Sequence, residues 1–200
     1  MILVTKNAPD FTSSAILNNG KIIEDFNLKN YIKNKYAIIF FWPMDFTFVC
    51  PSEIIAFNNR YLDFKNRNIK IVGISCDSVF VHNAWKSTSI KNGGIGKIFF
   101  PMVSDIKHEI INSYGIAHPK LGIALRGSFI IDKKNIIRHQ SINDLPIGRN
   151  VNEIIRIIDA LKFHEKNKKV CPAQWEKNSE GMEASIEGVK KYLSKNYKNI

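Results

Sequence analysis

The sequence predicts an α/β fold: a central mixed sheet flanked by helices, with a C-terminal arm. Short, continuous apolar runs of strand length alternate with segments whose apolar residues recur every three or four positions. The 200 residues, 44% hydrophobic and 24% charged, suit one domain of ordinary size with an appendage. We therefore expect a core domain over residues 1–164 and an arm over residues 165–200.

The N-terminal part of the chain predicts a hairpin and then a buried strand. Residues 14–17 and 21–25 flank Asn18-Asn19-Gly20, and an Asn-Gly pair suits the positive φ angles of a type I′ turn. Residues 37–42 (AIIFFW) are apolar throughout and too few for a typical helix, which is typical of a strand covered on both faces. Pro43 ends this strand.

The middle of the chain continues the alternation. After Pro51, apolar residues between positions 54 and 64 have helical spacing. Residues 70–75 (KIVGIS) predict a second buried strand, and residues 78–87 predict a short helix capped by Ser78. Residues 127–132 and 135–141 then predict a second hairpin.

The C-terminal part begins with a helix and then becomes mostly polar in composition. Apolar residues between positions 151 and 161 recur at helical spacing, with Asn150 as the N-cap and an end near Phe163. Residues 165–181 are mostly polar, so we expect a segment held by sparse contacts. Residues 182–193 predict a final amphipathic helix.

Charge and hydropathy limit the partners that this chain can have. The net charge of +11 is spread along the sequence, and 23 lysines stand against 6 arginines, whereas proteins that read bases favour arginine. We expect no specific nucleic-acid partner, although a polyanion-binding basic protein stays open as a separate class. The longest apolar run has eight residues, and residues 1–12 lack a signal-peptide pattern, so we expect no membrane span and a cytoplasmic protein.

The three cysteines, Cys50, Cys76 and Cys171, form no Cys-x-x-Cys pair. Zinc ribbons and dithiol motifs therefore have no support, and the five histidines show no metal-ligand spacing either. An odd number of cysteines in a reducing compartment also argues against a structural disulfide framework. Any cysteine chemistry must be sought one residue at a time.

Cys50 stands where a buried strand gives way to a helix. Pro51 suits the first helical position, because the N–H groups of the first turn have no acceptor within the helix and the lack of an N–H in proline costs no hydrogen bond there. Cys50 then lies at or beside the helix N-cap, where free amide groups and the positive end of the helix dipole favour a thiolate. A free cysteine is also often a small buried apolar residue. From position alone, both interpretations stay open.

Several motifs of this chain resemble those of one family. Pro43, Thr47 and Cys50 have the spacing Pro-x-x-x-Thr-x-x-Cys, inside the longer string FTFVCP at residues 46–51. Further matches, in chain order, lie at residues 75–85, 125–132, 143–149 and 170–175. Over nearly its whole length the chain resembles the typical two-cysteine peroxiredoxins, the family of thioredoxin peroxidases and alkyl hydroperoxide reductase subunits.

The resemblance implies a thioredoxin-like fold and a thiol peroxidase that needs no metal or organic cofactor. It makes Cys50 the peroxidatic cysteine, which reduces hydrogen peroxide or an organic hydroperoxide and becomes a sulfenic acid. It makes Cys171 the resolving cysteine, whose disulfide with Cys50 is then reduced by thioredoxin or a similar dithiol protein. In this family the resolving cysteine comes from the other subunit, so the resemblance implies a homodimer, often gathered into a ring of five dimers.

The family also assigns roles to the surroundings of Cys50. Lowering a thiol pKa from about 8.5 to about 6 raises the thiolate fraction at pH 7 roughly 30-fold but costs about 13-fold in nucleophilicity, so acidity alone gains only about twofold. The larger gain comes from donors to the peroxide oxygens, each worth on the order of 100- to 1000-fold. The resemblance gives that role to Thr47 and Arg126, has Pro43 shield the sulfur from water, and has Glu53 and Arg149 orient Arg126.

Two features bear on regulation. Residues 93–96 (GGIG) nearly match a family loop that braces the fold against unwinding, but Tyr192-Leu193 replaces the Tyr-Phe pair of the last helix. We therefore expect intermediate sensitivity of Cys50 to overoxidation. The alternative function, in a different class, is a holdase chaperone built on the same oligomer, as some family members become.

Overall fold

The computed structural model describes residues 1–198, and the chain divides into two compact units, Met1–Arg149 and Asn150–Ile200. The arm predicted over residues 165–200 falls within the second unit, and its last two residues lie outside the described part. The predicted boundary between residues 164 and 165 stays a prediction.

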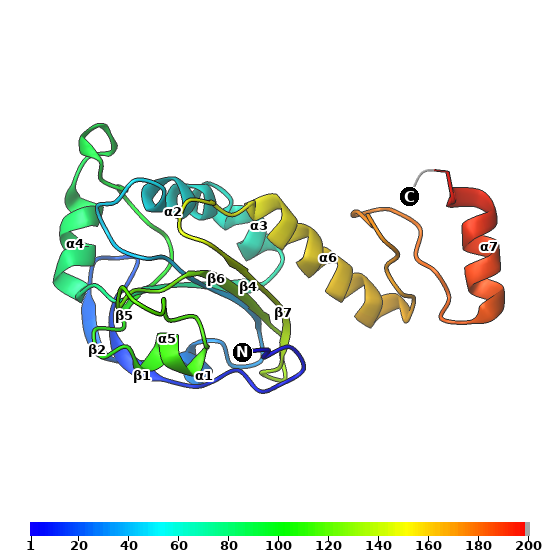
Figure 1. Ribbon diagram of the computed structural model, residues 1–200, viewed down its shortest axis with the longest axis horizontal. Coiled ribbons are helices and arrows are strands. Elements are labelled where there is room, and N and C mark those ends of the chain that lie inside the picture. The colour runs from blue at the N-terminus through cyan, green and yellow to red at the C-terminus, as the bar shows by residue number, and fades with distance from the viewer. Residues whose placement is uncertain (199–200) are drawn as a thin grey trace. The chain divides into compact units, whose positions relative to one another are not determined.

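The first unit is built on a seven-stranded mixed sheet in the order β2-β1-β5-β4-β3-β6-β7 (Figure 1). Strands β3, β4 and β5 run parallel to one another, whereas the other neighbours are antiparallel. The bounds are β1 (Thr12–Ile16), β2 (Ile22–Asn27), β3 (Tyr36–Phe41), β4 (Ile69–Ser75), β5 (Met102–Ser104), β6 (Arg126–Ile131) and β7 (Ile137–Asn143). The predicted mixed sheet with flanking helices is confirmed.

Strand β3 is buried along all six residues because helices cover both faces of the sheet. On one face, Ile39 and Phe41 pack in a core cluster with Leu28 and Ile110; on the other, the Phe40 ring stacks on Phe57 at 4.0 Å. Figure 1 shows α1 and α5 on the first side and α2 and α3 on the opposite side. The helices of this unit are α1 (Leu28–Tyr31), α2 (Cys50–Asn59), α3 (Tyr61–Asn66), α4 (Val79–Ser87) and α5 (Glu109–Ser113), with a short 3₁₀ turn, η1 (Ile90–Asn92). The continuous apolar run therefore marks a strand with two covered faces.

The N-terminal hairpin forms, but its predicted turn type is wrong. Leu17 N donates to Lys21 O at 2.9 Å, so three residues rather than two close the loop. Within residues 17–21, positive φ is confined to Gly20, at 85°. The extra loop residue lets Asn18 and Asn19 keep ordinary φ angles and leaves one left-handed position, which glycine fills without strain.

Other element boundaries also differ from the prediction. The single helix predicted after Pro51 is divided at Arg60 into α2 and α3, and α1, η1, β5 and α5 have no counterpart in the predicted series. All four missed elements are short, with three to five residues, so no full apolar period marks them. Ser78 caps α4 as predicted, accepting from Val81 N at 3.3 Å.

The second unit contains α6 (Val151–Asn167) and α7 (Ile186–Asn196). Asn150 caps α6 as predicted, but α6 runs four residues past Phe163 to Asn167, and its C-cap residue Lys168 has a φ of 57°. Helix α7 starts later than predicted because Met182 pairs with Val170 in an isolated bridge and Ser185 caps the helix. Among the described residues, no helix has the length and apolar character needed to cross a membrane.

Candidate active site

Cys50 is the first residue of α2, at the end of the loop that follows β3. Pro51 lies in the first turn of the helix, as its ring and missing N–H favour. The Cys50 side chain is fully buried, at 0% exposure. The position predicted from sequence, at or beside the helix start, is the one observed.

A buried polar network fixes the loop between β3 and Cys50. Trp42 Nε1 donates to Asp45 Oδ1 at 2.8 Å, and Asp45 Oδ2 lies 2.7 Å from His82 Nδ1 on α4. Asp45 N in turn donates to Asp77 Oδ2 at 2.9 Å. Burial raises the pKa of the Asp45 carboxyl, and the hydrogen bond with His82 opposes that effect. The network ties the loop to two distant segments, so the loop backbone has little freedom.

Two side chains reach the Cys50 sulfur with polar atoms. Thr47 Oγ1 lies 3.0 Å from Sγ and 2.7 Å from Met44 O, and Arg126 Nη1 lies 3.4 Å from Sγ. A hydroxyl has one proton, so Thr47 donates either to Met44 O or to the sulfur. The hydroxyl can thus accept from a thiol and donate to a thiolate without moving.

Arg126, the first residue of β6, is held from two directions. Its Nη1 also donates to Glu53 Oε2 at 2.6 Å, and its Nε donates to Leu145 O at 2.7 Å. Arg126 and Glu53 are 4% and 3% exposed, so their ion pair is sheltered from solvent. The guanidinium therefore faces the sulfur from a fixed position.

Arg149 occupies the other side of the same carboxylate. Its Nε and backbone N donate to Glu53 Oε1 at 2.8 and 2.9 Å, and its Nη2 donates to Oε2 at 2.9 Å. Its Nη1 donates to the carbonyls of Phe41 and Gly127, both at 2.7 Å. Burial lowers the pKa of Arg149, and Glu53 opposes that effect. Two guanidiniums and one carboxylate leave one unbalanced positive charge beside the Cys50 sulfur.

The structure thus brings together Cys50, Thr47, Glu53, Arg126 and Arg149 of the predicted set. Pro43 is buried at the start of the loop, and its shielding of the sulfur stays a prediction. Cys76 follows β4, and burial, reinforced by Asp105 and Asp77, raises its pKa to about 12. A thiol with that pKa stays protonated near neutral pH, which does not suit a nucleophile.

Cys171 lies in the second unit, where the arm packs on α6. The half-buried Cys171 donates its S–H to Ala160 O at 3.4 Å. Arg156 Nη1 donates to Trp175 O at 2.7 Å, and the rings of Trp175 and Phe163 lie 4.9 Å apart. Burial raises the pKa of Cys171, and the charge of Arg156 opposes that effect.

Sequence reasoning missed two residues that organise these regions. Asp45 lies inside the Pro43–Cys50 motif at a position that the motif leaves open, so nothing in the spacing marks it. Arg156 resembles any other charged residue on an amphipathic helix, and its contact with Trp175 O depends on how the arm folds back. Ala160 lies four residues after Arg156 and therefore on the same face of α6. This spacing is the one signal in the sequence that could have identified the face on which the arm packs.

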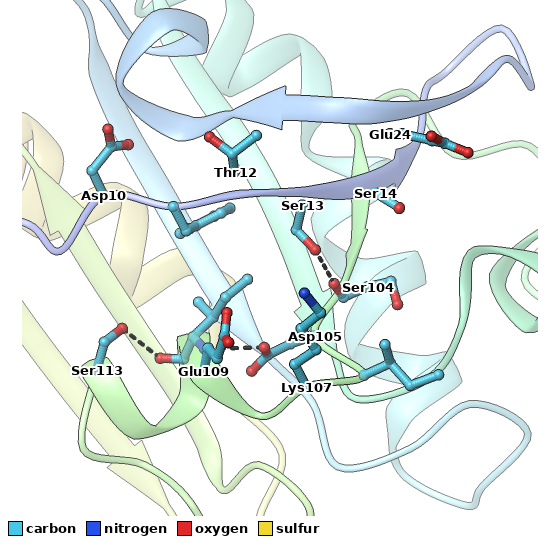
Figure 2. A pocket seen from close by; sticks show the side chains of 13 residues that line it. Asp10, Thr12, Ser13, Ser14, Glu24, Ser104, Asp105, Lys107, Glu109 and Ser113 are labelled. Atoms are coloured by element: carbon cyan, nitrogen blue, oxygen red, sulfur yellow. Dashed lines mark hydrogen bonds between the residues drawn. The ribbon is translucent and has the colours of Figure 1, made fainter.

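Other parts of the structure offer weaker sites. Within residues 1–198, no group of three or more His, Cys, Asp and Glu side chains is placed to hold a metal ion. A cavity of about 340 Å³ between β1, β5 and α5 is lined by carboxylates and hydroxyls, among them Asp10, Glu24, Asp105 and Ser13 (Figure 2). None of its described lining residues is a cysteine. Neither feature offers a second site for thiol chemistry, so Cys50 remains the candidate.

Comparisons with known proteins cover nearly the whole chain. The model of the AhpC/TSA family matches residues 4–140, and the model of the C-terminal domain of 1-Cys peroxiredoxin matches residues 160–195. The chain is 63% identical over 195 residues to alkyl hydroperoxide reductase C of Buchnera aphidicola subsp. Acyrthosiphon pisum, covering 98% of this chain and 99% of that protein. It is 49% identical to alkyl hydroperoxide reductase C of Helicobacter pylori, with 98% of each chain covered. The crystal structure of reduced Plasmodium vivax 2-Cys peroxiredoxin superposes with a TM-score of 0.93 at 43% identity, covering 97% of this chain and 100% of that one.

Proposed function

This chain belongs to the AhpC/TSA family and is a thiol peroxidase with a thioredoxin-like fold, and we propose that Cys50 is the residue that attacks the peroxide. One observation carries the proposal: the sulfur of Cys50 lies 3.0 Å from a hydroxyl and 3.4 Å from a buried guanidinium. Neither Cys76 nor Cys171 has a comparable pair of donors among the described residues.

The peroxidatic step follows from this geometry. The Cys50 thiolate attacks the terminal oxygen of a hydroperoxide, an S–O bond forms and the O–O bond breaks. The cysteine is oxidised to a sulfenic acid that keeps the proton of the terminal oxygen, and the departing alkoxide or hydroxide takes a proton and leaves as alcohol or water. Arg126 and Thr47 donate to the oxygens on which charge develops, and Glu53 and Arg149 keep Arg126 in place.

The substrate is hydrogen peroxide or an organic hydroperoxide. Two relatives are called alkyl hydroperoxide reductase C, which supports the organic class. Because Cys50 is fully buried, the site favours a reactant with a small reacting end, such as the –O–OH group of a hydroperoxide. Pro43 would keep bulk water from the sulfur. The chemistry needs no metal or organic cofactor, because the peroxide itself is the oxidant.

Cys171 is proposed to resolve the sulfenic acid. Its thiol displaces the hydroxyl of the sulfenic acid at Cys50, which gives a disulfide and one water. Thioredoxin or a similar dithiol protein then returns both thiols by exchange. All three cysteines are free in the structure, which therefore corresponds to the reduced form in this cycle.

The proposed assembly is a homodimer in which Cys171 comes from the other subunit, with a ring of five dimers as the larger form. Strand β7 is at one end of the strand order. The N-terminal segment covers the start of its outer edge, since Thr5 N donates to Ile137 O at 2.8 Å and Ile137 N donates to Lys6 O at 2.9 Å. The rest of that edge has no strand partner among the described residues. Such an edge can pair with a second copy of the same strand. Two-fold symmetric pairing would be the simplest closed arrangement.

A coupled peroxidase assay tests the function. With thioredoxin, thioredoxin reductase and NADPH, Cys50→Ser is expected to abolish peroxide-dependent NADPH oxidation, whereas Cys76→Ser is expected to keep it within about twofold of the wild type. Retention of turnover in Cys50→Ser would refute the assignment. Non-reducing electrophoresis after peroxide tests resolution: a covalent dimer is expected in the wild type and not in Cys171→Ser.

A further inference from the structure

The turn after β4 contributes a carboxylate that the proposed peroxidatic step does not use. Asp77 lies two residues past the end of β4, and its Oδ2 accepts from Asp45 N at 2.9 Å. Asp45 belongs to the loop that carries Thr47, whereas Asp77 belongs to the second motif, at residues 75–85. The contact therefore joins the two motifs at one backbone amide.

Ser75 holds the Asp77 carboxylate in place. Ser75 is the last residue of β4 and is fully buried, and its Oγ donates to Asp77 Oδ2 at 2.7 Å. The same Oγ accepts from Asp77 N at 3.1 Å, so a closed turn fixes both the backbone and the side chain of Asp77. Because β4 pairs with β3, the carboxylate has a set position relative to the loop that follows β3.

A single peptide group transmits this constraint to Thr47. Met44 O and Asp45 N–H belong to the same planar, trans peptide group, so they point in opposite directions. On one side the N–H donates to Asp77, and on the other side Met44 O lies 2.7 Å from Thr47 Oγ1, from which it can accept. Rotation of this peptide would move Met44 O and remove the acceptor that locates the hydroxyl. Asp77 thus fixes the plane that sets the position of Thr47 Oγ1, 3.0 Å from the Cys50 sulfur.

The backbone between Asp45 and Thr47 needs such a constraint because it is strained. Phe46 has a φ of 54°, in the left-handed region that a bulky residue rarely adopts. Phe46 is 51% exposed, so burial of its ring supplies only part of the compensation. Strained conformations persist where the surrounding contacts determine them. Two side chains hold the Asp45 carboxylate, whereas Asp77 holds its backbone N–H and with it the peptide that precedes Phe46.

We propose that Asp77 is a positioning residue of the peroxidase, which holds the Thr47 hydroxyl beside Cys50 through the Met44–Asp45 peptide. The inference rests on the proposed roles of Cys50 and Thr47. Within residues 1–198, no hydrogen bond joins Asp77 to Thr47 or to the Cys50 sulfur, so its effect must pass through the peptide. A donor that is in place before the peroxide arrives needs no reorganisation during the reaction, and a displacement of about 1 Å can lower the rate on the order of 100-fold.

A double-mutant cycle on the full-length reduced protein, measured by stopped-flow tryptophan fluorescence, tests the proposal. Thr47→Val is expected to slow the reaction of Cys50 with hydrogen peroxide by on the order of 100-fold, and Asp77→Ala by at least about tenfold. Because both substitutions remove the same contact, the double variant is expected to stay within about threefold of Thr47→Val. A loss of less than about tenfold in Asp77→Ala, or losses that multiply in the double variant, would overturn the proposal.

Asp77→Asn separates the hydrogen bond from a general loss of folding. Its amide oxygen can still accept from Asp45 N and Ser75 Oγ, so the rate is expected to stay within about threefold of the wild type. Asp10→Ala is the matched control, because it removes a carboxylate that likewise accepts from a backbone N–H, that of Lys29 at 3.0 Å. Its rate should stay within about twofold of the wild type. An Asp77→Asn variant as slow as Asp77→Ala, or an equal loss in Asp10→Ala, would refute the positioning role.

Alkylation of Cys50 by iodoacetamide gives a readout that a merely structural role would not separate from the peroxide rate. Alkylation uses the thiolate but breaks no O–O bond, so Asp77→Ala is expected to lower the peroxide rate at least about threefold more than the alkylation rate. Equal losses in the two rates would contradict the proposal. If Thr47→Val keeps the wild-type peroxide rate, the proposed role of Thr47 itself fails, whereas a slow Thr47→Val beside a fast Asp77→Ala overturns the role of Asp77 alone.

Discussion

The surroundings of Cys50 and those of Cys171 are built in opposite ways. Around Cys50, each charged side chain has several partners, and Glu53 alone accepts four hydrogen bonds from Arg126 and Arg149. Around Cys171, a few separate contacts hold the arm on α6, and the buried Trp175 Nε1 has no hydrogen-bond partner among the described residues. A site that stabilises developing charge must be rigid, whereas a segment that delivers a second thiol must come loose.

The energies of the two regions follow this contrast. Removing one partner from a buried ion pair typically costs 3–5 kcal/mol, because the other charge is left uncompensated. A single hydrogen bond to a charged group contributes about 1.5–3 kcal/mol, and an unpaired buried N–H costs a similar amount. We therefore expect substitutions near Cys50 to affect chemistry and global stability, and substitutions in the arm to affect local opening.

The largest expected effect is on the peroxidatic rate. Arg126→Ala removes the guanidinium 3.4 Å from the sulfur and is expected to slow the reaction of Cys50 with hydrogen peroxide by on the order of 100- to 1000-fold. Stopped-flow tryptophan fluorescence measures this rate. Arg60→Ala, which removes a half-buried arginine paired with Asp63, is the control and should leave the rate unchanged. A loss of less than tenfold in Arg126→Ala would contradict the assigned role.

Glu53→Ala probes the rigidity of the same region. It leaves Arg126 and Arg149 buried without their carboxylate, so the free energy of unfolding is expected to fall by about 3–5 kcal/mol. Chemical denaturation followed by circular dichroism measures the change. Glu153→Ala, on the exposed face of α6, should cost under about 1 kcal/mol. Similar costs for the two variants would remove the contrast between the regions.

A smaller effect is expected from Arg156→Ala on α6, which removes a contact between α6 and the arm. Trp175 O loses its donor at 2.7 Å, so the arm should open roughly tenfold more often. Easier opening brings Cys171 to the sulfenic acid sooner, and less Cys50 is then overoxidised to sulfinic acid. Mass spectrometry after turnover with excess peroxide measures the sulfinate fraction, and Arg156→Lys should give an intermediate value. An unchanged or higher fraction in Arg156→Ala would mean that this contact does not hold the arm.

The smallest effect concerns Cys76. Its pKa is raised from 9.0 to about 12 in the folded protein, so the unfolded chain loses the thiol proton first as pH rises. The stability contributed by keeping this thiol neutral is therefore present below pH 9 and lost between pH 9 and 12. Wild type should lose more stability over that window than Cys76→Ala. Iodoacetamide at pH 8 should label native Cys76 far more slowly than the unfolded chain, and equal labelling would contradict the shift.

The strands and the site were predictable from different kinds of information. Continuous apolar runs gave β3 and β4 to within one residue, because a strand covered on both faces leaves a pattern in the sequence itself. The grouping of Arg126, Arg149 and Glu53 came instead from a family resemblance, since these residues are far apart in the chain. Their shared hydrogen bonds depend on the sheet order, which no local pattern contains.

The remaining differences each have an identifiable physical cause. The turn at Gly20 depends on whether two or three residues close the loop, and both choices use the same Asn-Gly pair. The late start of α7 depends on the bridge between Val170 and Met182, a contact twelve residues apart. The role of Asp45 could not be predicted, because it depends on hydrogen bonds with Trp42 and His82 that form only in the folded chain. The turn is therefore settled locally, whereas the bridge and the contacts of Asp45 with His82 depend on how distant segments pack.

The most direct test of the central claim traps the first oxidation product. Cys171→Ser protein is treated with one equivalent of hydrogen peroxide in the presence of dimedone, which forms a stable adduct with sulfenic acids, and is then digested and analysed by mass spectrometry. The account predicts the adduct on the peptide that contains Cys50, with none on the peptide that contains Cys76. A Cys76 adduct, or consumption of peroxide with Cys50 unmodified, would contradict it.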